Sequence, residues 1–178
     1  MKVQKILKSK KANSTPLTVA LILCLLIVCC GIAEYFRLMI IVSGVRDGLQ
    51  QAVITVSTTN YDEVYNGLRE GYSGGYILSG ESWNESLDYD DVYSRMDNLL
   101  GTVQQGGYHV KIQEGGYEYR YSGLSIEIIN APFTPGGADD NFEADASVQI
   151  EVPLSFGFSM LPPLKMEVRA TAAYMPKF

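Results

Sequence analysis

The fold of this chain is decided by residues 16–56, which run PLTVALILCLLIVCCGIAEYFRLMIIVSGVRDGLQQAVITV. The first part, residues 16–33, carries no charged side chain. At a helical rise of ~1.5 Å per residue it would cover about 27 Å, close to the ~30 Å hydrocarbon core of a membrane. Asn13, Ser14 and Thr15 lead into Pro16, which is typical of a helix start. We therefore predict a transmembrane helix over residues 16–33.

Glu34 and Arg37 are the first charged residues after the apolar run. A charge at the centre of a bilayer costs about 2.5–3.5 kcal/mol on insertion scales, so we expect both residues at the outer membrane interface. They are three positions apart and can pair on one helix face. In the alternative interpretation, residues 38–42 are also submerged, and Glu34 is an intramembrane carboxylate that meets a partner subunit.

Beyond Arg37, apolar side chains recur at alternating intervals of four and three residues, which is a heptad pattern. The six positions are Leu38, Val42, Val45, Leu49, Ala52 and Val56. This seam is either a helix association face that binds another copy or another subunit, or a face that packs on the chain's own domain. Gly44 and Gly48 lie on the same stretch and permit close approach of a second backbone in both cases.

Charge is distributed unevenly along the chain, whose formal net charge is −6. The first 11 residues contain five lysines and no acidic residue, which predicts a cytoplasmic N-terminus. Residues 34–178 hold the remaining nine basic residues against 20 acidic ones. Such an acidic domain argues against nucleic acid as a partner, because phosphate binding requires a basic face.

The three cysteines, Cys24, Cys29 and Cys30, all lie in the apolar run, so we expect a domain without disulfides. The run is longer than the ~7–15 apolar residues of a signal peptide, and no small-x-small cleavage pattern follows it. We therefore expect an uncleaved anchor.

The remaining sequence predicts two short helices followed by a sheet. Residues 61–68 and 89–96 share the pattern Y-D-[DE]-V-Y-x-x-[LM], which is either an internal duplication or two amphipathic helices with acidic first turns. The second helix extends to Leu100 and is closed by Gly101. Alternating apolar residues then predict strands over residues 109–113, 117–128, 148–158 and 164–174, with a β-bulge at Ser122-Gly123.

These elements predict an α+β fold: an antiparallel sheet of about four strands with one solvated face, carried on a membrane helix that extends into an amphipathic one. The domain organisation is a basic cytoplasmic tail (residues 1–15), a transmembrane helix (16–33), an extracytoplasmic extension of that helix (34–57) and an extracytoplasmic α+β domain (58–178).

The sequence offers little that could support catalysis. His109 is the one histidine, and no motif supplies a nucleophile for it. No glycine-rich phosphate loop leads from a strand into a helix, and no CxxC lies outside the apolar run. The acidic segment Asp139–Asp145 alternates oxygen ligands but lacks the EF-hand spacing, which favours a solvated loop over a calcium site. We expect neither an enzyme nor a bound cofactor or metal.

The architecture resembles that of pilins and pseudopilins, and in particular the TadE-like minor pilins of Gram-positive bacteria. Three stretches carry the resemblance: Cys30–Arg37 at the end of the apolar run, Val45-Arg46-Asp47 on the extended helix, and the ending from Val152-Pro153-Leu154 to Met166–Ala172. Unlike pilins, the chain has no glycine ahead of its apolar run with a glutamate five residues on. The resemblance implies a membrane anchor, whereas this departure argues against processing by a prepilin peptidase, so that either the anchor is permanent or assembly works differently.

We therefore expect a single-pass protein of the bacterial cell membrane that serves as a structural or assembly subunit of a pilus, secretion or conjugation apparatus. Its expected partners are the membrane and, through the N-terminal helix, other copies or other subunits. The alternative is an anchored extracytoplasmic domain that binds a ligand or acts as a sensor.

Overall fold

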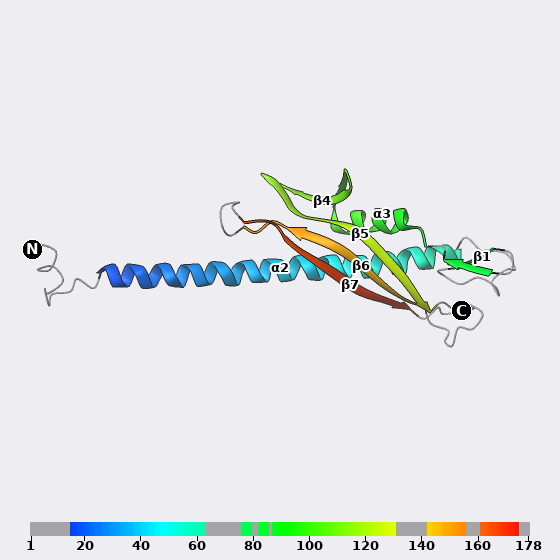
Figure 1. The fold of residues 1–178 in the computed structure, drawn as a ribbon, viewed down its shortest axis with the longest axis horizontal. Coiled ribbons are helices and arrows are strands. Elements are labelled where there is room, and N and C mark those ends of the chain that lie inside the picture. Colours follow the sequence, from blue (N-terminus) through cyan, green and yellow to red (C-terminus); the bar gives the residue numbers. More distant parts are fainter. Residues whose placement is uncertain are drawn as a thin grey trace, which may run out of the picture. The chain divides into compact units, whose positions relative to one another are not determined.

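The computed structural model describes residues 15–62, 76–79, 82–85, 87–130, 142–155 and 161–174 (Figure 1). These residues form two helices, a two-stranded sheet and a five-stranded antiparallel sheet, an α+β fold as predicted. The chain divides into two compact units, one up to Arg37 and one from Leu38 onward.

Helix α2, Thr15–Asp62, contains both the apolar run and the amphipathic extension predicted from the sequence. All residues from Thr15 to Ala33 are exposed, whereas several residues after Leu38 are buried in the second unit. The predicted helix over residues 61–68 is not seen as a separate element. Tyr61 and Asp62 end α2, and residues 63–68 lie outside the described part of the chain.

Helix α3, Tyr89–Leu100, has the boundaries that its capping residues predict. The Asp88 side chain accepts hydrogen bonds from the backbone N–H groups of Asp90 and Asp91, which satisfies donors in the first turn. Gly101 ends the helix at φ +64°, a conformation that glycine adopts at little cost. Val92 and Met96 form its buried face.

The five-stranded sheet has the order β3-β4-β5-β6-β7, and each strand is antiparallel to its neighbours. The strands are β3 (Val103–Gln105), β4 (Tyr108–Gln113), β5 (Gly116–Asn130), β6 (Phe142–Val152) and β7 (Leu164–Tyr174). The sequence prediction missed β3 and the start of β6. Phe156 and Phe158, which we expected in the latter strand, lie outside the described residues.

The predicted β-bulge is confirmed, because the pairing of β5 with β6 shifts between Ser122 and Ser125. Gly123 has φ +66° there, and Gly115 has φ +87° in the turn between β4 and β5. A separate hairpin that we did not predict pairs β1 (Tyr76–Ser79) with β2 (Ser82–Glu85).

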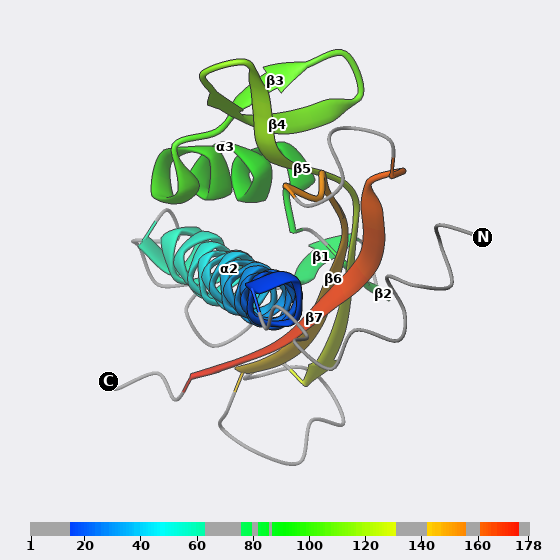
Figure 2. The ribbon, with the colours of Figure 1, turned by 90° about the vertical axis from the view of Figure 1, so that its left-hand side faces the viewer.

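The core lies between one face of the large sheet and the two helices α2 and α3, which cover that same face (Figure 2). In β7, Val168, Ala170 and Ala172 are buried, and the intervening side chains are exposed as the alternation predicted. These outward residues are Lys165, Glu167, Arg169 and Thr171. The opposite face of the sheet is therefore the solvated one.

Candidate functional site

The apolar first part of α2 is the most distinctive surface of the first unit. By length and composition α2 could cross a membrane, and none of its most apolar 18-residue window is buried. Signal sequences meet the same criteria, but a core helix of a soluble protein would bury such a stretch. Leu17 and Leu21 are 73% and 65% exposed, and the side chains between them are exposed too. This surface is compatible with a single-pass membrane anchor.

Glu34 and Arg37 form the ion pair that their spacing predicts. Arg37 Nη1 donates a hydrogen bond to Glu34 Oε1 at 3.0 Å. Tyr35 and Phe36, between them in sequence, are exposed, and their rings make an edge-on contact with centroids 5.8 Å apart. Mutual neutralisation lowers the cost of placing both charges at a membrane interface, and exposed aromatic rings are typical of that depth.

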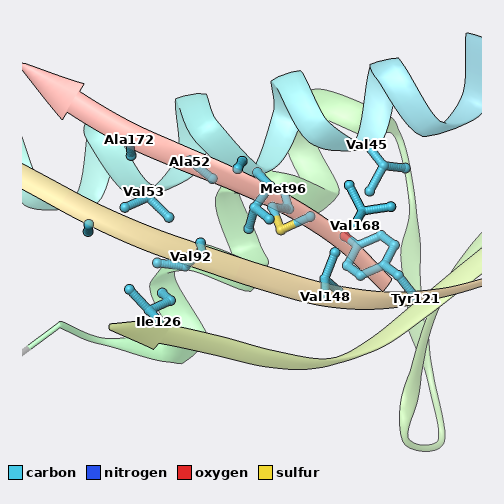
Figure 3. Close-up of a cluster of buried hydrophobic side chains, with 14 of the residues drawn as sticks. Val45, Ala52, Val53, Val92, Met96, Tyr121, Ile126, Val148, Val168 and Ala172 are labelled. Carbon is cyan, nitrogen blue, oxygen red and sulfur yellow. The ribbon is translucent and has the colours of Figure 1, made fainter. Parts of the chain in front are cut away.

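The heptad seam packs on its own domain, so the expectation that it forms an association face is corrected. Val45, Leu49 and Ala52 have no exposed surface, and Val56 is 3% exposed. Figure 3 shows Val45 and Ala52 among the buried side chains between α2 and the sheet. Leu38 and Val42 are partly buried against the same core. The reason is that the apolar faces of the sheet and of α3 need a cover, and the seam provides it. The spacing had established that the face is buried, not what buries it.

A buried polar cluster joins the end of α3 to strands β4 and β5. His109 Nδ1 lies 2.9 and 2.8 Å from the two carboxylate oxygens of Asp97. The Tyr121 hydroxyl donates to Asp97 Oδ1 at 2.9 Å, and the Thr102 hydroxyl donates to the same oxygen. The ring of Tyr93 stacks on His109 with centroids 4.2 Å apart.

In this cluster the carboxylate is the common acceptor, and both hydroxyls are directed at it. Burial raises the pKa of Tyr121 well above its usual range, so this hydroxyl stays protonated and keeps donating. The arrangement is that of a network that fixes α3 on the sheet rather than that of a histidine activating a nucleophile. Nothing in the sequence connected Asp97 with His109, because they come from different elements.

The solvated face of the sheet carries a row of charges across three strands. Glu151 accepts hydrogen bonds from Arg120 Nε at 2.8 Å and Nη2 at 2.6 Å, and its other oxygen lies 2.6 Å from Lys165 Nζ. Lys165 and Arg120 hold the pKa of Glu151 below its usual range. The Arg120 guanidinium also lies over the Tyr108 ring, 4.1 Å from its centroid.

A polar hollow of about 450 Å³ lies against strands β5, β6 and β7. The charged side chains in its lining are Arg46, Glu127, Asp145, Glu167 and Arg169. Two hydrogen bonds hold side chains of this lining in place. Arg169 Nη2 donates to Glu167 Oε2 at 3.0 Å, and Thr171 Oγ1 donates to Asp145 Oδ1 at 2.7 Å. The lining alternates in sign, which suits a polar ligand with both donors and acceptors.

Within the described ranges, no group of three or more histidine, cysteine, aspartate or glutamate side chains is arranged to hold a metal ion. Of the acidic segment Asp139–Asp145, residues from Phe142 on belong to β6, and residues 139–141 lie outside the described part. Cys24, Cys29 and Cys30 are free thiols exposed on α2.

The chain matches no protein-family model, no curated protein and no solved structure.

Proposed function

We propose that the protein is a membrane-anchored structural or assembly subunit, of the minor-pilin or TadE-like kind, in a bacterial surface pilus, secretion or conjugation apparatus. In this proposal the N-terminus lies in the cytoplasm and the sheet domain outside the cell membrane. The first half of α2 associates laterally with other copies or with other anchored subunits.

One observation carries the proposal: a single helix supplies both the unburied apolar segment and the main cover of the sheet. Among the described residues, every side chain from Leu17 to Ala33 is exposed, whereas Val45, Leu49 and Ala52 are buried in the second unit. Within residues 15–62 no loop separates the apolar segment from the part of α2 that covers the sheet. A flexible linker would be expected if the anchor merely tethered the domain.

The burial of the seam moves the expected association surface towards the N-terminus. Residues available for contact within the membrane are the exposed apolar side chains of the first unit, such as Leu21, Leu25 and Val28. Without a hydrophobic driving force between helices in lipid, close packing of such side chains has to provide the affinity.

Disulfide cross-linking in membranes tests the proposal. A variant with Cys24, Cys29 and Cys30 replaced by alanine receives single cysteines at successive positions from Leu21 to Val28. Association through one helix face predicts cross-linked adducts that recur every three to four positions. A disulfide reports a second copy of the chain, and a thiol-linked photoactivatable cross-linker on the same cysteines captures another anchored subunit that has no cysteine of its own. Mass spectrometry of the adducts identifies the partner in either case.

The control is a cysteine at Leu49, which has no exposed surface and should not cross-link. If every position from 21 to 28 yields only monomer, the subunit proposal is overturned. The sensor alternative then gains weight, since the polar hollow over β5, β6 and β7 is the surface that favours it. In that case, ligand-induced chemical-shift changes are expected at Glu127, Asp145 and Arg169.

A further inference from the structure

The five-stranded sheet protects two of the places at which a strand has a free edge. β3, the first strand in the order, has only three residues and offers few backbone groups to another chain. The second place is β5 beyond Tyr121, where its pairing with β4 ends. Helix α3 covers that stretch with two tyrosine side chains.

The hydroxyl groups of these tyrosines take the place of a neighbouring strand. The Tyr93 hydroxyl accepts a hydrogen bond from the backbone N–H of Leu124 at 2.8 Å. The Tyr89 hydroxyl accepts one from the N–H of Ile126 at 3.3 Å and donates to its carbonyl oxygen at 3.2 Å. The shared pattern Y-D-[DE]-V-Y supplies both residues, so the motif at residues 89–93 protects a strand edge.

Strand β7, at the other end of the order, lacks such protection. It has 11 residues and pairs with β6 in one continuous register without a bulge. It contains no proline, and its buried side chains, Val168, Ala170 and Ala172, are all apolar. Among the described residues, no strand pairs with its other side. A long, regular edge of this kind is a template for an added strand.

The polar hollow described above reaches this edge. Its lining includes Arg46 together with Arg169 and Thr171. Arg46 belongs to α2, which covers the inner face of the sheet, whereas Arg169 and Thr171 project from the opposite face (Figure 2). A hollow that is lined from both faces extends around β7, the last strand. Part of the β7 edge therefore borders open space.

The outward side chains of β7 alternate in charge along this edge. Lys165, Glu167 and Arg169 have side chains that are 69%, 46% and 77% exposed. Lys165 is bound to Glu151 and Arg169 to Glu167, which holds both cations on the face of the sheet rather than across its edge. An added antiparallel strand places one residue directly opposite each of them, where opposite charges stabilise and like charges destabilise.

We propose that β7 is a docking site for an extended segment of another protein, which joins the sheet as an antiparallel strand. This segment carries acidic side chains opposite Lys165 and Arg169 and a basic side chain opposite Glu167. Apolar residues between them continue the inner face beside Val168 and Ala170. The inference concerns the second unit alone and does not depend on the proposed membrane anchor.

Fluorescence anisotropy of two labelled nine-residue peptides, added to the full chain in detergent, tests the proposal. Both peptides have valine at the odd positions. The matching peptide has Thr, Glu, Lys and Glu at the even positions, and the reversed peptide has Thr, Lys, Glu and Lys. We expect the matching peptide to bind at least about tenfold more tightly, because three cross-strand pairs change from opposite to like charge. The chain has a formal net charge of −6, so non-specific attraction would favour the reversed peptide instead.

A charge reversal in the chain locates the site. Arg169→Glu should weaken binding of the matching peptide about fivefold, since one opposite-charge pair becomes a like-charge pair. Arg95→Glu, at an exposed position of α3, changes the net charge equally and should leave the affinity unchanged. Equal losses in the two variants would overturn the assignment to β7.

Two further outcomes count against the proposal. Equal affinity for the two peptides, or binding of neither, would overturn it; the latter is expected if a second copy or the chain's own residues already cover the edge. N-methylation of the matching peptide at alternate residues gives two versions, one of which loses the N–H groups that face β7. If both versions bind as well as the unmodified peptide, strand addition is wrong.

Discussion

Gly48 of α2 lies directly against Leu100 of α3, so that a Cβ atom built on the glycine would be 3.0 Å from Leu100 Cδ2. The contact is where the two helices approach each other on the sheet. A leucine at this position cannot be accommodated without moving α3, and we expect Gly48→Leu to lower the free energy of unfolding by about 1–3 kcal/mol. Urea unfolding of the full chain in detergent, followed by circular dichroism, measures the change.

Gly44 provides the matched control, because a Cβ atom there meets nothing within 4 Å. Gly44→Ala should stabilise the helix by roughly 0.5–1 kcal/mol, the usual gain from replacing glycine in a helix interior. Gly48→Ala should fall short of that gain, since Leu100 has to shift. If Gly48→Leu unfolds at the same urea concentration as the parent chain, α2 and α3 do not approach as closely at Gly48 and Leu100 as described.

Asp97 is the acceptor on which the buried polar cluster depends. Asp97→Ala would remove the acceptor that the Tyr121 hydroxyl, the Thr102 hydroxyl and the His109 ring nitrogen share. The two hydroxyl oxygens lie 3.0 Å apart, so only one of these hydroxyls can then donate to the other. An unsatisfied buried group costs about 1–3 kcal/mol, and we expect a loss of at least that size in the free energy of unfolding. Asp97→Asn retains one oxygen and should lose less.

Asn98→Ala, at the exposed next position of α3, is the control for Asp97 and should change stability by less than about 0.5 kcal/mol. The same unfolding measurement applies to each variant. An Asp97→Ala chain that is as stable as Asn98→Ala would show that the cluster contributes nothing to holding α3 on the sheet.

The elements that were predictable from the sequence are those with local signals. Helix α3 has an aspartate cap, an acidic first turn and a terminal glycine, and each of these acts within a few residues. Strand β7 alternates over its whole length, and the phase slip in β5 located the bulge at Ser122-Gly123. The three residues of β3 are too few to show a period, so it was missed.

The parts of the candidate site that escaped prediction depend on long-range contacts. The heptad spacing established which face of α2 is buried, but the choice between a partner helix and the chain's own sheet depends on the sheet's apolar face. The pairing of Asp97 with His109 and the row Arg120–Glu151–Lys165 each join separate elements. Such side chains come together only through strand register, which local sequence does not specify.

The ion pairs of Glu151 make the stability of the domain depend on pH. Lys165 and Arg120 hold its pKa below the usual 4.5, so its stabilising contribution is present above pH 4.5 and is lost as pH falls through the lower folded-state value. Glu151→Gln should have a lower melting temperature than the parent chain at pH 7, and this difference in melting temperature should become smaller below pH 4.5. Thermal unfolding monitored from pH 7 to pH 3 tests this.

Lys165→Met removes one of the two cations from Glu151 and serves as a partner variant. At pH 7 Lys165→Met should lower the melting temperature by part of the amount that Glu151→Gln does. Introducing Glu151→Gln into the Lys165→Met chain should lower the melting temperature less than introducing it into the parent chain does. If the difference in melting temperature between Glu151→Gln and the parent chain stays constant from pH 7 to pH 3, the ion pairs of Glu151 are not what makes the stability depend on pH.

The charge on either side of the apolar run predicts the orientation of the proposed anchor in the membrane. Five lysines within the first 11 residues, with no acidic residue among them, should hold the N-terminus in the cytoplasm, and the acidic sheet domain should lie outside. Single cysteines at Ser9 and Ile129, in the chain without native cysteines, report the two sides. A membrane-impermeant maleimide should label position 129 in intact cells and position 9 only after permeabilisation.

Ile129 is exposed, so a lack of labelling there in intact cells cannot be ascribed to burial in the domain. The reverse labelling pattern would place the sheet domain in the cytoplasm and would rule out the proposed role in an external apparatus. Replacing the five lysines with glutamine should weaken the preference and give a mixture of the two patterns, because the charge step that selects the orientation is then lost.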